Sequence, residues 1–417
     1  MAAQQPDSVR IERLERQVEA ITRQLEALQL GEDVVAAADT GVYGFAPGAS
    51  KVYRAPRGVS IGGYGEVLFE GYAAERQDGS AANVPSQLDA LRAIVYVGYK
   101  FSDRILFNSE IEIEHGSTGQ AGSVSLEFGY IDYFFSDAVG ARAGMLLVPM
   151  GFVNEQHEPP TFLGTERPET ERRIIPSTWR ENGVGVFGSI GDVSARAYVI
   201  NGFDGIGGGT SGAGGFSASG LRGGRQKGSK AMAEDFAGVA RVDYDGVSGV
   251  ALGTSLYYGQ SGQNEQSPTD PGAAIGGETL IWEGHAEYRA HGFDVRGLFA
   301  LATVADAADI NELRGLSGNA SVGERLVGWY GQLGYDILWR TSSQHQLIPY
   351  VRYEALDTQN RVPAGYARNP ANDRTILTFG VAWKPLPQLV AKMDYGIHRN
   401  GADTGLNQLN VATGYLF

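Results

Sequence analysis

Acidic and basic side chains are concentrated in one segment of the chain, residues 149–182. Its basic members are Arg167, Arg172, Arg173 and Arg180, and its acidic members are Glu155, Glu158, Glu166, Glu169, Glu171 and Glu181. Five prolines stiffen it, and connections of this length are uncommon unless they carry function. Folded inward, such a segment would place opposite charges across a narrow gap of low dielectric, where they act strongly on a passing ion. A solvated external loop is the alternative.

A second set of basic residues lies within stretches that alternate apolar and polar side chains. The period of two places Arg92, Arg142, Arg196, Arg241, Arg296 and Arg352 on the polar face, together with a similar number of carboxylates. Arginine presents a fork of donors that suits phosphate or carboxylate. The polar face therefore suits small anions, but its balance of charges does not by itself define a selectivity.

Other kinds of chemistry find little support in the sequence. The six histidines lie far apart without metal-ligand spacing, so we expect no metal site and no cofactor. Gly183, Gly185 and Gly188 match G-x-G-x-x-G but open no helix, and no Ser–His pairing is visible, so we do not expect an enzyme. The net charge of −14 argues against nucleic acid as a partner. We expect the Gly-rich stretch 202–220 to be a mobile loop, and the basic stretch after it to be solvated or to contact lipopolysaccharide phosphates.

The alternating stretches predict the fold. From about residue 59, sixteen of them begin near residues 61, 88, 104, 123, 139, 183, 192, 236, 249, 279, 292, 326, 345, 373, 387 and 406. Short turns and long connections alternate between them, and aromatic residues lie beside the short turns, as in transmembrane β-barrels. We therefore predict an all-β protein, a 16-stranded antiparallel transmembrane β-barrel over residues 59–417 with a short N-terminal α-helical coiled coil. A β-sandwich also alternates, but it seldom carries so many charges on one face.

The N-terminal residues follow a different period. Ile11, Leu14, Val18, Ile21, Leu25 and Leu28 form an a/d heptad seam, and Arg10, Ile11, Leu14 and Glu15 resemble the pattern of short trimeric coiled coils. We expect a trimeric coiled coil over residues 1–30 and a spacer over residues 31–58. A helix lying on its own domain is the alternative. The first residues lack a charged and an apolar region, so we expect no signal peptide in this chain, and its start reads as a processed N-terminus.

The final stretch, residues 406–417, also alternates. Leu409, Val411, Thr413, Tyr415 and Phe417 fall on one side, and Asn410, Ala412 and Gly414 fall on the other. We expect this strand to close the barrel against the first strand, near residues 61–72.

Taken together, the strand layout, the terminal GYLF, the helical prefix and the segment from Ala143 to Arg167 resemble Gram-negative outer-membrane porins. The pattern is most similar to the phosphate-selective porin O/P group and to related trimeric porins with a periplasmic coiled coil. The resemblance implies a homotrimer in the outer membrane, in contact with lipid and lipopolysaccharide, with the helix in the periplasm. It also implies that residues 149–182 fold into the lumen as a constriction, and that Phe417 belongs to a signal for the barrel-assembly machinery.

The expected function is passive diffusion of small hydrophilic solutes with a preference for small anions, phosphate or carboxylates. The constriction would use Arg167, Arg172, Arg173, Arg180, Glu155 and Glu158. The alternatives are a non-selective or cation-leaning porin, a structural envelope tether and a barrel enzyme.

Overall fold

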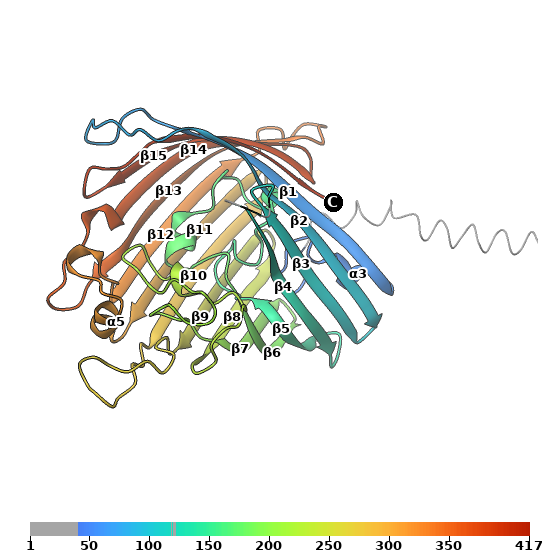
Figure 1. Ribbon diagram of the computed structural model, residues 1–417. Coiled ribbons are helices and arrows are strands. Elements are labelled where there is room, and N and C mark those ends of the chain that lie inside the picture. The colour runs from blue at the N-terminus through green and yellow to red at the C-terminus, as the bar shows by residue number, and fades with distance from the viewer. Residues whose placement is uncertain (1–40, 118, 120–121) are drawn as a thin grey trace, which may run out of the picture. The chain divides into compact units, whose positions relative to one another are not determined.

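A computed structural model describes residues 41–117, 119 and 122–417 (Figure 1). Within these residues, sixteen strands follow one another along the chain. They are β1 (Gly58–Tyr72), β2 (Gln87–Ser102), β3 (Ile105–Glu114), β4 (Ser123–Phe134), β5 (Val139–Leu147), β6 (Arg180–Ile190), β7 (Val193–Asn201), β8 (Phe236–Val247), β9 (Val250–Gly259), β10 (Thr279–Ala290), β11 (Phe293–Val304), β12 (Arg325–Tyr335), β13 (Gln346–Arg361), β14 (Asp373–Leu386), β15 (Leu389–Asn400) and β16 (Gln408–Leu416).

Short helices interrupt the connections between the strands. They are the α-helices α3 (Lys51–Arg54), α4 (Glu169–Arg173) and α5 (Ala307–Leu313) and the 3-10 helices η1 (Pro159–Thr161), η2 (Arg222–Gly224), η3 (Gly318–Ala320) and η4 (Pro370–Asn372). In the described part of the chain, no helix has the length and apolarity needed to cross a membrane. The expected coiled coil and its seam residues lie outside the described residues.

The strands form one closed antiparallel barrel. Each strand pairs with its neighbour in sequence, and β1 pairs with β16 to complete the ring. Tyr64 lies opposite Leu416, and Phe417 exchanges two backbone hydrogen bonds with Gly63, at 2.9 and 3.0 Å. The predicted 16-stranded antiparallel barrel is confirmed, and no strand begins more than three residues from its expected start.

The connections alternate in length as the sequence pattern predicts, with one exception: the connection 336–345 is longer than 115–122 and 401–407 at the opposite end of the barrel. At one end of the barrel lie the turns 103–104, 135–138, 191–192, 248–249, 291–292, 336–345 and 387–388. At the other end lie the longer connections 73–86, 115–122, 148–179, 202–235, 260–278, 305–324, 362–372 and 401–407. The first residue of β1, Gly58, lies at the short-turn end of the barrel, where it pairs with Lys100 of β2.

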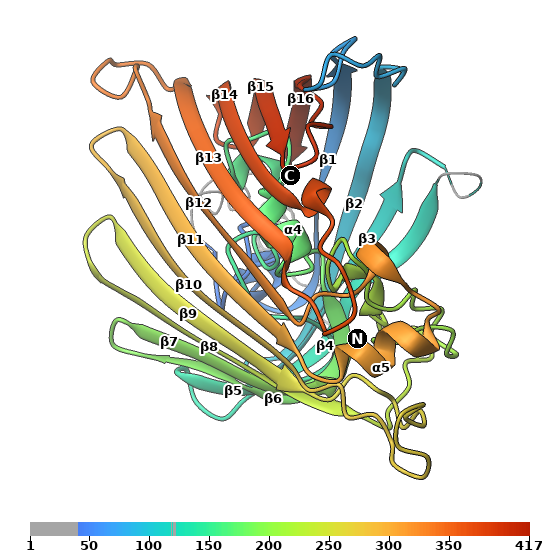
Figure 2. The same ribbon diagram turned by 90° about the vertical axis from the view of Figure 1, so that its left-hand side faces the viewer.

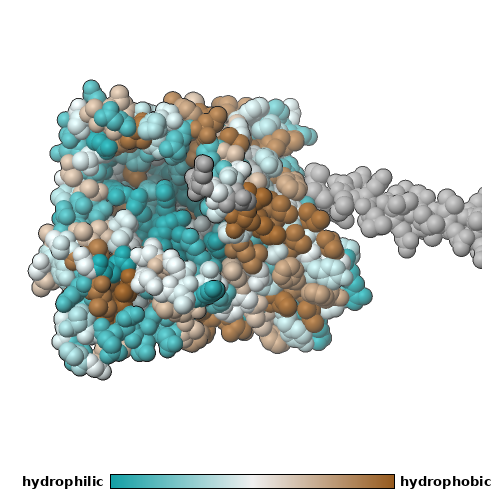
Figure 3. Space-filling model, viewed as in Figure 1, coloured by the Kyte–Doolittle hydropathy of each residue, from teal (hydrophilic) through white to brown (hydrophobic). Residues whose placement is uncertain are grey.

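The two faces of the wall differ in polarity because each strand alternates its side chains. On β16, Leu409, Val411 and Tyr415 are 40–46% exposed on the outside, whereas Asn410 and Ala412 are 4% and 2% exposed on the inside. Figure 3 shows apolar surface beside a hollow lined with hydrophilic residues. Exposed apolar surface of this extent requires apolar surroundings, while the charged interior requires water or internal partners.

Residues 41–57, named here the pre-barrel segment, lie inside the barrel. Phe45 and Val52 are 1% and 2% exposed, and Phe45 packs on Phe128 and Tyr130 of β4 at ring distances of 5.4 and 5.6 Å. Helix α3 contacts β1, β2 and β3. We expected this stretch to belong to a spacer, but its aromatic residues cover aromatic residues of the inner wall.

Candidate functional site: the charged interior of the barrel

The long connection between β5 and β6, residues 148–179, crosses the interior of the barrel and is named the lumen loop. Its helix α4 lies within the ring of strands (Figure 2) and contacts β12 and β13 on the far side. Thr165 donates its backbone N–H and its hydroxyl to Asp394 of β15, at 2.7 and 2.8 Å. Arg296 of β11 donates to the carbonyl of Thr161 at 2.6 Å. The loop is therefore fixed at two places, β11 and β15, on the part of the wall that lies across the ring from β5 and β6.

Buried hydrogen bonds of Asn154 hold the two ends of the lumen loop together. The Asn154 amide donates to the carbonyls of Val148 and Trp179, at 2.6 and 2.8 Å, and its oxygen accepts from the Trp179 N–H at 2.6 Å. Glu171, also buried, accepts from the Val153 N–H at 2.8 Å and from the Tyr330 hydroxyl at 2.6 Å. Since buried polar groups are costly when unpaired, these bonds oppose any movement of the loop out of the lumen.

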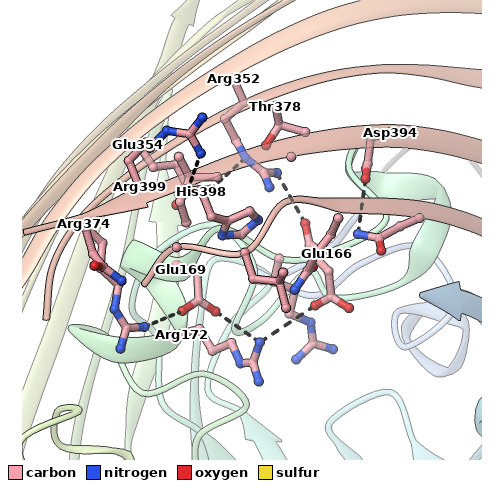
Figure 4. Close-up of a pocket in the computed structure, with 18 of the residues that line it drawn as sticks. Glu166, Glu169, Arg172, Arg352, Glu354, Arg374, Thr378, Asp394, His398 and Arg399 are labelled. Carbon is pink, nitrogen blue, oxygen red and sulfur yellow. Dashed lines mark hydrogen bonds and ion pairs between the residues drawn. The ribbon is translucent and has the colours of Figure 1, made fainter. Parts of the chain in front are cut away.

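A cavity of about 360 Å³ remains between the lumen loop and the wall formed by β13–β16 and the end of β1 (Figure 4). We name it the central cavity. Its charged lining consists of six arginines and five carboxylates: Arg167, Arg172, Arg173, Arg352, Arg374 and Arg399 with Glu70, Glu166, Glu169, Glu354 and Asp394. With every one of these groups ionised, the lining carries a net charge of +1.

Ion pairs run from the lumen loop to the wall across this cavity. Glu169 lies 3.0 Å from Arg172 and 3.5 Å from Arg374 of β14, and it also pairs with Arg173. Arg172 lies 3.9 Å from Glu166, whose carbonyl accepts from Arg352 at 3.3 Å. The alternation of sign keeps most charges of the cavity neutralised locally.

Glu166 belongs to this series of ion pairs and also lines the central cavity. Burial raises the pKa of Glu166 to about 7, and the neighbouring carboxylates Glu70 and Glu66 add to the effect while Arg172 opposes it. A carboxyl group with this pKa changes its charge between pH 6 and pH 8. The net charge of the cavity lining therefore depends on pH in that interval, because the neutral form of Glu166 leaves the lining at +2.

Arg167 differs from the other basic residues of the central cavity. Among the described residues neither Arg167 nor Arg399 makes an ion pair, but Arg399 donates to the His398 carbonyl and the Asn407 side-chain oxygen, whereas the Nε and Nη2 atoms of Arg167 are buried without a hydrogen-bond partner. Burial, and then repulsion by the nearby Arg92, lower the pKa of Arg167. The cost of holding this guanidinium without a counter-ion would be relieved by an anion in the cavity.

The six arginines expected to line the lumen all point inward, but each has an acidic partner. The pairs are Arg92–Glu66 at 3.4 Å, Arg142–Asp132 at 2.8 Å, Arg196–Asp243 at 2.5 Å, Arg241–Asp243 at 2.9 Å, Arg296–Glu287 at 2.8 Å and Arg352–Glu354 at 2.9 Å. Of these six, Arg352 lines the central cavity. Arg142 is covered by the pre-barrel segment, since its guanidinium stacks on Phe45 at 4.7 Å and bonds the Tyr53 hydroxyl at 2.8 Å.

The six residues expected to form the constriction fall into two groups. Arg167, Arg172 and Arg173 line the central cavity. Arg180, Glu155 and Glu158 lie elsewhere: Arg180 pairs with Glu127 at 2.6 Å, and Glu155 lies 3.5 Å from Arg196. Arg180, Glu155 and Glu158 therefore hold the loop and its end against neighbouring residues, while Arg167, Arg172 and Arg173 face the central cavity.

Glu158 connects the lumen loop to the pre-barrel segment. Its carboxylate accepts from the backbone N–H groups of Gly48 and Ala49, at 3.2 and 3.0 Å, and from the Tyr96 hydroxyl at 3.2 Å. Burial raises the pKa of Glu158 to about 7, against the lowering effect of the two backbone donors. Together, the loop and the segment narrow the lumen from two directions.

Some residues of the site were not among the sequence candidates. Arg399 and His398 line the central cavity near the end of β15, and the aromatic residues of the pre-barrel segment cover the opposite wall. The period of two would have placed His398 inside, in phase with Asp394. No sequence pattern indicated Arg399, which lies near the end of the strand.

Comparisons with known proteins identify the class of fold. No protein-family model matches the chain. Among solved structures, Salmonella typhi OmpF in complex with daunomycin is similar at a TM-score of 0.56 and 11% identity, over 87% of this chain and 98% of that one. An anion-selective porin from Comamonas acidovorans (TM-score 0.52, 12% identity) and a loop-deletion mutant of OmpT, an outer membrane protein of Vibrio cholerae (0.52, 10%), each match over 86% of this chain and 99% of theirs. The chain thus has the closed barrel fold of outer-membrane porins.

A relative in sequence defines the family more narrowly. An uncharacterized protein of Aquifex aeolicus (strain VF5) is 38% identical over 362 residues, which cover 84% of this chain and 78% of the relative. The chain belongs to the same family as that protein.

Proposed function

We propose that this protein is an outer-membrane pore for passive diffusion of small hydrophilic solutes. The observation that carries the proposal is the central cavity: a charged open space beside a fixed loop, enclosed by a wall whose outer face is apolar. A closed barrel with this distribution of polarity satisfies its backbone internally and exposes apolar side chains to lipid. The function is transport rather than catalysis.

The solutes that suit this cavity are small anions, phosphate or carboxylates. The arginines of the cavity outnumber its carboxylates by one, and Arg167 has no counter-ion among the described residues. The guanidinium fork matches phosphate and carboxylate oxygens, and its field is strong in a narrow space of reduced dielectric. Because the excess of charge is small, a non-selective or cation-leaning pore is the alternative.

Conductance in planar lipid bilayers tests the transport function. Purified full-length protein should insert as open channels, and it should do so in steps of three if the pores assemble as a homotrimer through the coiled coil of residues 1–30. Reversal potentials under a KCl gradient then measure the preference for chloride. The absence of any conductance from well-folded protein would overturn the proposal.

The surroundings of the protein follow from the same proposal. The apolar outer face would contact outer-membrane lipid and lipopolysaccharide, with the short turns and the N-terminal helix on the periplasmic side. Phe417, which joins β16 to β1 through Gly63, would serve the barrel-assembly machinery as a terminal signal.

A structural tether of the cell envelope is a second candidate, favoured by the pre-barrel segment. This segment occupies the lumen and is bonded to the lumen loop through Glu158, so the barrel would serve mainly to hold the N-terminal helix. Removal of residues 1–57 separates the two functions, with removal of residues 1–30 as the matched control. A pore should conduct in all forms and conduct more without residues 41–57, whereas a tether should show no current until that segment is removed.

A further inference from the structure

The connection between β7 and β8, residues 202–235, is folded rather than loose, and is named the mouth loop. Phe216 is fully buried against Phe203 at a ring distance of 5.3 Å, and its N–H donates to the Gly205 carbonyl at 2.8 Å. At its far end, the Ala218 carbonyl accepts from Thr358 of β13 at 2.6 Å. The Gly-rich sequence predicts a mobile loop, but these contacts hold it across the long-connection end of the barrel.

A separate cavity of about 560 Å³ lies in the mouth loop and is named the mouth cavity. Its charged lining consists of four cations, Arg222, Arg225, Lys227 and Arg314, and no carboxylate takes part in it. The remainder is glycine, alanine, glutamine and serine, and the hydroxyls of Ser217 and Ser219 lie 2.9 Å apart. This lining offers positive charge and neutral hydrogen-bond donors together.

The cations of the mouth cavity lack counter-ions. Within the described residues, none of the four is in an ion pair. Arg225 is 6% exposed and donates to the carbonyls of Arg222 and Pro176, at 3.0 and 3.2 Å, and of Thr178. Arg314 donates to the Ile206 carbonyl, and its Nε atom is buried without a partner.

Carboxylates lie near the mouth cavity but form no ion pair with its cations among the described residues: Asp204 attracts Arg314, and Glu127 and Glu181 attract Arg225. Glu127 pairs with Arg180 at 2.6 Å, and Glu181 accepts from the Gln226 N–H at 2.8 Å and from the Asn201 amide at 2.7 Å. Burial, and then repulsion by Arg225, Arg172 and Arg167, lower the pKa of Arg222. This repulsion also shows that the mouth cavity lies within electrostatic reach of the cations on the lumen loop.

Glycine is required for this arrangement at two positions. Gly215 has φ of +72°, and a Cβ atom there would lie 1.6 Å from the Arg314 Nη1. At Gly223, a Cβ atom would lie 2.2 Å from the Gly215 carbonyl oxygen. The glycines thus allow the backbone to close around the guanidinium groups, which a loop with larger side chains could not do.

We propose that the mouth cavity binds a multivalent oxyanion, of the class of phosphate, phosphate esters and sulfate, through Arg222, Arg225, Lys227 and Arg314. Guanidinium groups pair with such anions through charge-assisted hydrogen bonds, and serine hydroxyls complete the coordination. A tetrahedral oxyanion supplies negative charge in direct contact with these cations, where the lining itself has no carboxylate. The role of the site as a capture point for solute rests on the proposed pore function, but binding itself does not.

The test measures binding of inorganic sulfate and inorganic phosphate by calorimetry, with full-length protein in phosphate-free detergent solution. Sulfate remains divalent across the working pH range, so changes in its binding report on the protein. The variants Arg222→Gln and Lys227→Gln remove side chains that make no hydrogen bond among the described residues, so the barrel should fold normally. Lys230→Gln removes the same charge from an exposed position of the same loop that does not line the cavity.

Each of the two cavity variants should weaken sulfate binding by about tenfold, as expected for loss of one charge-assisted contact, whereas Lys230→Gln should bind as the wild type does. Absence of saturable binding of either anion, or equal weakening by all three variants, would overturn the proposal. A parallel arm uses vesicles with and without lipopolysaccharide. Competition by lipopolysaccharide, lost in Arg222→Gln, would assign the site to a lipid phosphate; its absence would assign the site to a soluble anion.

Conductance distinguishes this inference from the proposed function. Channels that conduct KCl normally but bind no sulfate would refute the oxyanion site and leave the pore intact. Protein that binds sulfate but never conducts would refute the pore and leave the site intact.

Discussion

A charge series at Glu166 and Arg167 tests whether the central cavity sets ion selectivity. The two residues are adjacent on the lumen loop and both line the cavity. With Glu166 ionised, the lining has a net charge of +1 in the wild type. It becomes +2 in Glu166→Gln, zero in Arg167→Gln and −1 in Arg167→Glu. We expect the ratio of anion to cation permeability to be highest in Glu166→Gln and to decrease through the wild type and Arg167→Gln to Arg167→Glu.

The size of each step follows from Coulomb's law. A unit charge about 6 Å from a passing ion in water contributes about 0.7 kcal/mol, and screening at physiological ionic strength roughly halves this value. Because the effect has opposite sign for anions and cations, each unit of charge should change the permeability ratio by about three- to tenfold. Arg167 is suited to this test because it has no ion-pair partner among the described residues, so its removal leaves no buried carboxylate without a partner.

Reversal potentials under a tenfold KCl gradient measure this ratio directly. Arg340→Gln is the matched control, because it removes one positive charge from the short-turn connection 336–345, outside the cavity lining. A permeability ratio that is the same in all four proteins, or that changes as much in Arg340→Gln as in Arg167→Gln, would refute the assignment of selectivity to this cavity.

Three further perturbations have defined outcomes. Since the pKa of Glu166 is raised to about 7, this carboxyl is neutral at pH 6 and anionic at pH 8; the anion preference should therefore fall as pH rises through 7, and it should stay constant in Glu166→Gln. Deletion of Phe417 removes two backbone hydrogen bonds to Gly63 at the closing seam, so the yield of folded protein in membranes should drop while the single-channel conductance of the protein that does fold is unchanged. Arg142→Ala leaves Asp132 buried without its partner and should lower the free energy of unfolding in vesicles by about 3–5 kcal/mol, measured by denaturant titration; an unchanged unfolding midpoint would show that the pre-barrel segment and Asp132 do not depend on this guanidinium.

The barrel was predictable because its wall imposes a period of two on every strand. Lipid outside the barrel favours apolar residues, and polar surroundings inside favour polar residues, so the two types alternate along each strand. The start of each strand and the face on which each arginine lies can therefore be predicted from the sequence without knowing any contact. The register of neighbouring strands cannot be read in this way. Arg196 lies opposite Arg241 across β7 and β8, and both reach Asp243; this three-way contact depends on the register of two strands that are joined by the long connection 202–235.

The pre-barrel segment was missed because it has no period of its own. A signal was nevertheless present on the strands that it covers. Tyr96 and Tyr130 fall on the inward face, next to Phe128, and large apolar rings facing a water-filled lumen require a cover. The rings of Phe45 and Tyr53 supply that cover. In this barrel, aromatic residues in phase with the lumen charges therefore mark the part of the inner wall that the pre-barrel segment covers.

Pairing of the lumen charges explains why a count of charged residues could not define the selectivity. Arg196, Arg241 and Arg296 are each held by carboxylates of the wall, and they also fix the position of the lumen loop. Charges neutralised at 2.5–2.9 Å contribute little field at the position of a passing ion. The long-range field of the interior then depends on the cations that make no ion pair among the described residues, including Arg167 at the central cavity and Arg222 in the mouth cavity. Burial, and then repulsion by Arg225, Arg172 and Arg167, lower the pKa of Arg222, so an anion that binds between the mouth and the central cavity is stabilised by cations of both.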